Sequence, residues 1–166
     1  MTKFQETETI ELKKSTSELK EAIISLVAML NKHQRGEIIF GIRNDGTVVG
    51  QQVSDKTIRD VSKAIADHVE PRIYPVVEHV TLAGKAGIKV QAEGGEHPYY
   101  AYGRAYIRVG DEDRQLSAKE LENLILAKNR DRLRWDTEIC EKATLDDISA
   151  ATVSYTHLTL PTNREV

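Results

Sequence analysis

A stretch with helical periodicity is followed directly by a short stretch typical of a β-strand. This junction constrains the fold more than any other feature of the sequence. In residues 15–33 the apolar positions recur every three or four residues, as in a helix with one wet face. Residues 37–42 then form a compact apolar stretch. Asn44, Asp45 and Gly46 follow, and these residue types tolerate the positive φ of a tight hairpin turn. A chain that changes periodicity over so short a span belongs to a fold that mixes helices and sheets.

The rest of the chain continues this mixture of elements. A short strand at residues 9–13 precedes the first helix. The later expected elements are a helix capped by Ser54 and ended before Pro71, strands within residues 74–83, 87–94 and 105–110, and a closing helix at residues 116–128. Ser117 and Glu120 have the spacing of a capping box in that last helix. This order predicts an α+β fold class, a single domain with a mixed β-sheet and about three helices over residues 4–128.

Composition narrows the class of protein. The chain has 166 residues, 40% of them hydrophobic and 30% charged, as in an ordinary globular domain. Its formal net charge is −3, so a nucleic-acid surface would have to be a local basic patch. The single cysteine, Cys140, excludes an internal disulfide framework and a cysteine-rich zinc site. No apolar run reaches membrane-spanning length and no leader opens the chain, so we expect a cytoplasmic protein without a membrane partner.

The last part of the sequence has a different character. Residues 129–151 are charged and weakly periodic, which is typical of a linker or of the start of a missing downstream domain. The tail from Thr152 to Val166 contains SYTHLTLPT, which resembles translated sequencing-adapter sequence. We therefore interpret residues 152–166 as non-native and expect the natural protein to continue beyond this break.

The stretch IELKKS near the start of the chain is the first candidate site. Alternation along a strand at residues 9–13 places Glu11 and Lys13 on one polar face. An acid and a lysine in this arrangement could hold a metal ion and a phosphate together. The same pattern also occurs on solvated strand faces with a weak ion pair. From spacing alone, the solvated face is the more common explanation.

A second candidate site lies later in the chain, where basic and aromatic residues interleave. Arginine forks match phosphate geometry, and aromatic faces can stack on bases. We expect Ala105 and Ile107 to face the core. Alternation then places Arg104, Tyr106 and Arg108 together on the other face. The acidic residues directly after this strand dilute the basic surface, and tyrosines are also ordinary sheet residues.

Three stretches of the chain resemble one family. ETETIELKKS, GEIIFGIRNDGTVVG and YYAYGRAYIRVGDEDRQLSAKEL are similar in order and spacing to the Schlafen AlbA_2 domain, a family of DNA-binding domains also called divergent AAA-4. The resemblance covers residues 4–128 and implies an Alba-like or Schlafen-core-like fold that binds nucleic acid. Many members are labelled ATP-binding. The chain itself has no GxxxxGK[ST] phosphate loop, and we expect no cofactor for the binding function.

The resemblance also implies a catalytic possibility, because some Schlafens cleave RNA with three carboxylates and a metal ion. Those positions correspond here to Glu6, Glu11 and a residue shortly after Gly41. Spacing places the third position on Asn44, which is not an acid, although Asp45 is adjacent. A nuclease that uses Glu6, Glu11 and Asp45 with magnesium or manganese is therefore the alternative prediction.

The favoured hypothesis is a module that binds the backbone of DNA or RNA and forms the N-terminal part of a bacterial transcriptional regulator. Phosphate contacts position a protein on nucleic acid without selecting a sequence. A protein-interaction or homodimerisation domain is the third hypothesis. The expected nucleic-acid-binding residues are Lys13, Lys14, Tyr99, Arg104, Tyr106, Arg108 and Arg114.

Overall fold

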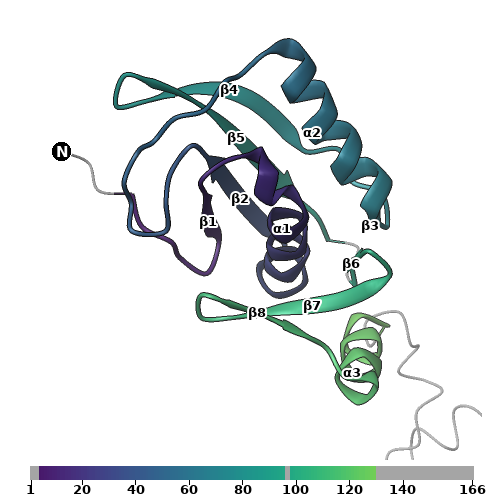
Figure 1. The fold of residues 1–166 in the computed structure, drawn as a ribbon. Coiled ribbons are helices and arrows are strands. Elements are labelled where there is room, and N and C mark those ends of the chain that lie inside the picture. The colour runs from purple at the N-terminus through teal and green to yellow at the C-terminus, as the bar shows by residue number, and fades with distance from the viewer. Residues whose placement is uncertain (1–3, 96–97, 130–166) are drawn as a thin grey trace, which may run out of the picture. The chain divides into compact units, whose positions relative to one another are not determined.

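Helices and strands alternate along the described part of the chain. The computed structural model describes residues 4–95 and 98–129, which all lie in one compact unit, Met1–Arg130. In chain order the elements are β1 (Ile10–Lys13), the 3-10 helix η1 (Thr16–Glu18), α1 (Leu19–His33), β2 (Arg35–Phe40), α2 (Asp55–His68), β3 (Val69–Glu70), β4 (Val76–Leu82), β5 (Lys85–Glu93), β6 (Tyr100–Ala101), β7 (Arg104–Val109), β8 (Glu112–Gln115) and α3 (Ala118–Asn129) (Figure 1). The expected α+β fold class is confirmed for these residues. The domain boundaries 4–128 stay a prediction, and the predicted linker and tail, from residue 130 onward, lie outside the described residues.

The strands form two sheets that differ in their pairing. The first sheet has the order β1-β2-β5-β4, with β1 parallel to β2 and the other neighbours antiparallel. The second has the order β3-β6-β7-β8 and is antiparallel throughout. In the first sheet Glu11 lies opposite Ile38, which belongs to the main core, whereas Leu12 lies opposite Ile39 in a smaller cluster. Glu11 therefore points to the side of the sheet that α1 covers.

The helix α1 lies at the centre of the unit. It packs against β2 of the first sheet and against β7 of the second. Its middle part is consequently buried on nearly every side, at Ala22, Ile23, Ser25, Leu26, Val27, Ala28, Met29, Leu30 and Asn31. The expected wet face is wrong for this stretch, because a helix between two sheets has no side left for water. Neither α1 nor any other helix in residues 4–95 and 98–129 is long and apolar enough to cross a bilayer.

Local sequence signals set the start of two helices and one turn as expected. Ser54 caps α2 by accepting a hydrogen bond from a backbone amide three residues on. The capping box of α3 is confirmed, since the Ser117 amide donates to Glu120 at 2.9 Å and the Glu120 amide donates back to the Ser117 hydroxyl at 3.3 Å. The turn after β2 has Gly46 at φ 84°, and the Thr47 amide donates to Asp45. Across that turn, Ile42 and Val48 form an isolated antiparallel bridge and not the extended pairing of a hairpin.

Candidate functional site

A buried arginine joins the two candidate sites. The Arg108 side chain is 0% exposed, and its Nη2 donates to Glu11 Oε2 at 2.6 Å while its Nη1 donates to Asp113 Oδ1 at 2.8 Å. Glu11 lies on β1 and Asp113 on β8, so the guanidinium links an edge strand of the first sheet to an edge strand of the second. We call Glu11, Lys13, Ser25, Arg108 and Asp113 the charge cluster.

The remaining carboxylate oxygens of the charge cluster also have hydrogen-bond donors, whereas the buried Arg108 Nε has no partner. Lys13 Nζ donates to the remaining oxygen of Glu11 at 2.5 Å. The Ser25 hydroxyl of α1 donates to Asp113 Oδ2 at 2.5 Å. Each carboxylate oxygen therefore has a donor, which is the condition for burying charge without a large penalty. The prediction that Glu11 and Lys13 share one face of the strand is confirmed, but that face is covered, so the solvated interpretation is wrong.

The electrostatics keep Arg108 charged. Burial lowers the pKa of Arg108, but the hydrogen bonds and charges of Asp113 and Glu11 outweigh this effect, so the pKa lies above its usual value. A guanidinium that never loses its proton provides a permanent internal cation. This cation and the Lys13 ammonium balance the two carboxylates.

Glu6 approaches the charge cluster, whereas Asp45 does not join it. Glu6 Oε1 accepts from the Leu12 amide at 3.3 Å, and both burial and repulsion by Glu11 raise the pKa of Glu6. Asp45 lies exposed in the turn after β2. Across residues 4–95 and 98–129, no three His, Cys, Asp or Glu side chains come together in a group that could hold a metal ion. The three carboxylates of the nuclease hypothesis are therefore not assembled, and nuclease activity itself stays a prediction.

Three exposed basic residues lie on the strands that carry the charge cluster or directly after them. Lys14 follows β1 and is exposed, and Arg104 at the start of β7 is exposed with a hydrogen bond to Gln115 at 3.2 Å. Arg114 is 60% exposed and forms an ion pair with Glu120 of α3.

Two further expectations about β7 and its surroundings need correction. Arg104, Tyr106 and Arg108 do share one face of β7, but Tyr106 and Arg108 face inward, toward α1, and Tyr106 packs against the main core. Tyr99 is also buried, at 3% exposure, and its backbone is held by Asn31 of α1. The expectation that Arg108 and Tyr99 are exposed for nucleic-acid binding is therefore wrong, because α1 covers this side of the sheet.

Sequence reasoning missed Ser25 and gave Asp113 only a diluting role. A serine in the middle of an apolar helical run was the available signal, because a polar group buried there needs a partner. Its partner lies 88 residues away, which no local pattern reveals.

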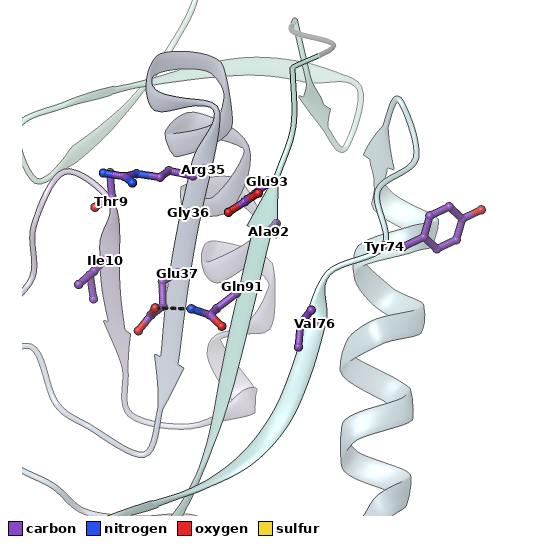
Figure 2. Close-up of a pocket in the computed structure, with 10 residues that line it drawn as sticks. All are labelled: Thr9, Ile10, Arg35, Gly36, Glu37, Tyr74, Val76, Gln91, Ala92 and Glu93. Carbon is purple, nitrogen blue, oxygen red and sulfur yellow. Dashed lines mark hydrogen bonds between the residues drawn. The ribbon is translucent and has the colours of Figure 1, made fainter.

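The outer face of the first sheet has an open groove of about 640 Å³. Figure 2 shows Arg35, Glu37, Gln91 and Glu93 on its floor, with Tyr74 directed away from it. Gln91 donates to Glu37 at 2.9 Å, and Glu37 also pairs with Lys89, so the Glu37 carboxylate in this groove already has two partners. None of the predicted site residues lines this groove.

Comparison with known families decides the family of the chain. The model of the family described as "Schlafen, AlbA_2" matches residues 6–117, which is more than half of the 166 residues. The chain belongs to the Schlafen AlbA_2 family. The charge cluster and the exposed residues around it all lie within the matched AlbA_2 region. No curated protein matches the chain.

Two solved structures are similar to the AlbA_2 chain. The DIP2311 protein from Corynebacterium diphtheriae has a TM-score of 0.58 and 16% identity, over 92% of this chain and 31% of that one. The N-terminal domain of a RecG-related protein, named after an ATP-dependent DNA helicase, from Nitrosomonas europaea has a TM-score of 0.48 and 23% identity, over 69% and 86% of the two chains. The likeness to DIP2311 shows the fold. The chain spans about a third of the length of DIP2311.

Proposed function

We propose that the AlbA_2 domain binds nucleic acid through the phosphate backbone. Family membership supports this function, and one observation in the structure carries it: Lys13 and Arg108, far apart in sequence, bind the same carboxylate of Glu11. The two basic segments of the sequence thus meet at one place. The charge cluster itself is balanced, so in a chain of net charge −3 the attraction of phosphate would depend on the exposed basic residues of these two segments, Lys14 and Arg104.

The residues of the two segments take different parts in this proposal. Lys14 and Arg104 are exposed and would contact phosphates directly, with Arg114 as a further contact beside α3. Lys13 is 12% exposed and donates one hydrogen bond to Glu11. The other N–H groups of its ammonium could then donate to a phosphate oxygen. Arg108 is a positioning residue, because it orients Glu11 and thereby Lys13. We further propose that the domain is the N-terminal part of a bacterial regulator.

The salt dependence of binding tests the phosphate contacts. Affinity for duplex DNA of unrelated sequences should fall steeply as salt rises, because each phosphate contact releases counterions. The double variant Lys14→Ala, Arg104→Ala should bind all sequences more weakly and flatten the logarithmic salt slope by about two units. Fluorescence anisotropy over a salt series measures both quantities.

A charge-matched variant controls for the loss of net charge. Lys56→Ala with Arg59→Ala removes the same charge from exposed positions of α2, and its salt slope should equal that of the wild type. Salt-independent binding by the wild type would reject the proposal. Equal losses in the two double variants would show that net charge alone matters and that the basic residues near the charge cluster form no specific site.

The nuclease hypothesis has its own test. Lys13 and Arg108 already occupy both oxygens of Glu11, so a metal ion would have to displace a cation there. We expect no manganese-dependent cleavage of structured RNA or single-stranded DNA by the wild type. Robust cleavage by the wild type that the variant Glu11→Ala abolishes would show that the domain is a nuclease and not only a binding module.

A further inference from the structure

The turn between β6 and β7 has an unusual residue at its tip. Tyr102 and Gly103 form this two-residue turn and have φ values of 52° and 74°. Positive φ at both positions is the geometry that favours Asn followed by Gly, and it is uncommon for a bulky side chain. The Tyr102 amide donates to the His68 carbonyl at 3.0 Å, which fixes the turn against the end of α2. A tyrosine in this conformation costs stability, and such costs often accompany a functional side chain.

The Tyr102 ring lies among side chains from two other elements. It stacks on the His68 ring with a centroid distance of 4.5 Å and an angle of 28°. Lys20 of α1 places its ammonium 5.7 Å from the ring centroid. Tyr102 is nevertheless 37% exposed, and both Lys20 and His68 are exposed. An aromatic ring is thus held at the surface by a second ring, beside a cation on a flexible stem.

We propose that Tyr102, supported by His68 and Lys20, is a stacking site for an unpaired base of single-stranded nucleic acid. The inference rests on the proposed function and adds a ligand class to it. An exposed cation–π contact contributes about a few-fold to an equilibrium, whereas a base stacked on an aromatic ring contributes about five- to one-hundred-fold. A base therefore displaces the Lys20 ammonium from the ring with a net gain, and the ammonium moves to a neighbouring phosphate.

The surroundings of the ring favour stacking over charge attraction. Burial and then the nearby Glu21 carboxylate raise the pKa of Tyr102, so its hydroxyl stays neutral and does not repel phosphate. Glu21 itself opposes phosphate, which offsets the Lys20 charge. Arg104 directly follows the turn and is exposed, so a strand whose base stacks on Tyr102 has a phosphate contact at hand. The site connects in this way to the proposed backbone contacts.

The test compares two strands that differ only in their bases. One probe is a single-stranded oligothymidine, and the other is an abasic strand of the same length, with the same phosphates. The main variant is Tyr102→Asn, because Asn suits the left-handed turn while it removes the ring. Tyr102→Phe retains the ring, and Tyr74→Ala removes a tyrosine that is 83% exposed beside the sheet groove.

We expect Tyr102→Asn to lower affinity for oligothymidine about tenfold, with an unchanged salt slope and unchanged affinity for the abasic strand. Its melting temperature should equal or exceed that of the wild type, because Asn-Gly is the favoured turn. Tyr102→Phe and Tyr74→Ala should bind both strands as the wild type does. This combination separates loss of a stacking ring from loss of folding.

Other outcomes overturn the inference in distinguishable ways. Equal losses on the two strands would show that Tyr102 acts through the backbone contacts. Unchanged oligothymidine binding by Tyr102→Asn, with a steep salt slope retained, would reject the stacking site and leave the proposed function intact. A wild-type protein that binds neither strand would reject both.

Discussion

At the scale of single residues, burial decides what a charge can do. Period-two alternation was enough to place Glu11 and Lys13 on one face of β1. The same reasoning could not show that this face is covered, because the cover comes from Arg108, 97 residues further along the chain. A basic residue that sequence reasoning assigns to phosphate binding becomes, in the structure, the internal partner of two acids.

The stability of the domain should depend strongly on Arg108. Arg108→Met keeps the approximate volume but leaves the partly buried Asp113 without a cation and leaves the buried Glu11 with Lys13 alone. The free energy of unfolding should fall by about 3 kcal/mol, which is the usual cost of removing one partner of a buried ion pair. Urea denaturation measures it, with the exposed Arg104→Met expected to change stability by less than about 0.5 kcal/mol. Wild-type stability in Arg108→Met would show that water reaches the two acids freely.

Glu6 should make stability depend on pH in a defined direction. Burial and repulsion by Glu11 raise the pKa of Glu6 in the folded state, so its charged form destabilises the fold above that pKa. This cost is relieved as the pH falls through the folded pKa toward the ordinary glutamate value. Glu6→Gln should therefore be more stable than the wild type at a pH of about 7, and the difference should vanish at a pH of about 4. Urea unfolding at the two pH values measures the stability difference between Glu6→Gln and the wild type. A stability difference that grows on acidification would contradict a raised pKa of Glu6 as its cause.

At the scale of whole elements, helices were predictable where period and caps agreed. Ser54 and Ser117 begin α2 and α3 as their sequences indicate. The strand β8 was not predictable, because its sequence, Glu-Asp-Arg-Gln, has no apolar alternation. It is a strand because it pairs with β7 and because Asp113 is held by Arg108 and Ser25. Tertiary contacts here override a local sequence typical of a loop.

The pairing of β8 should consequently weaken when Asp113 loses its charge. Asp113→Asn keeps the shape of the side chain but weakens both of its charge-assisted hydrogen bonds. Amide hydrogen exchange in β7 and β8 should report an opening free energy lower by about 1.5 kcal/mol. Glu112→Gln, at the exposed neighbouring position, should leave exchange unchanged. Equal effects of the two substitutions would show that net charge, not the cluster, holds the hairpin.

At the scale of the whole molecule, overall charge opposes the proposed function. The net charge is −3 at pH 7 and reaches zero near pH 6.0. Affinity for duplex DNA at constant ionic strength should therefore be several-fold higher at a pH of about 5.5 than at about 8, because general repulsion of phosphate disappears. Anisotropy titrations at the two pH values test this. Weaker binding at the lower pH would indicate that an ionised carboxylate, not a cation, makes the decisive contact.

The central position of α1 also has a consequence for the order in which the protein is made. A ribosome synthesises β1, α1 and β2 early, and these can pair at once. The β7-facing side of α1 and the carboxylate of Glu11 must then wait until β7 leaves the exit tunnel. A nascent chain that stops before β7 presents an uncovered apolar helix face, the kind of surface that associates with other chains. The late hairpin therefore supplies the cover that the second side of α1 requires.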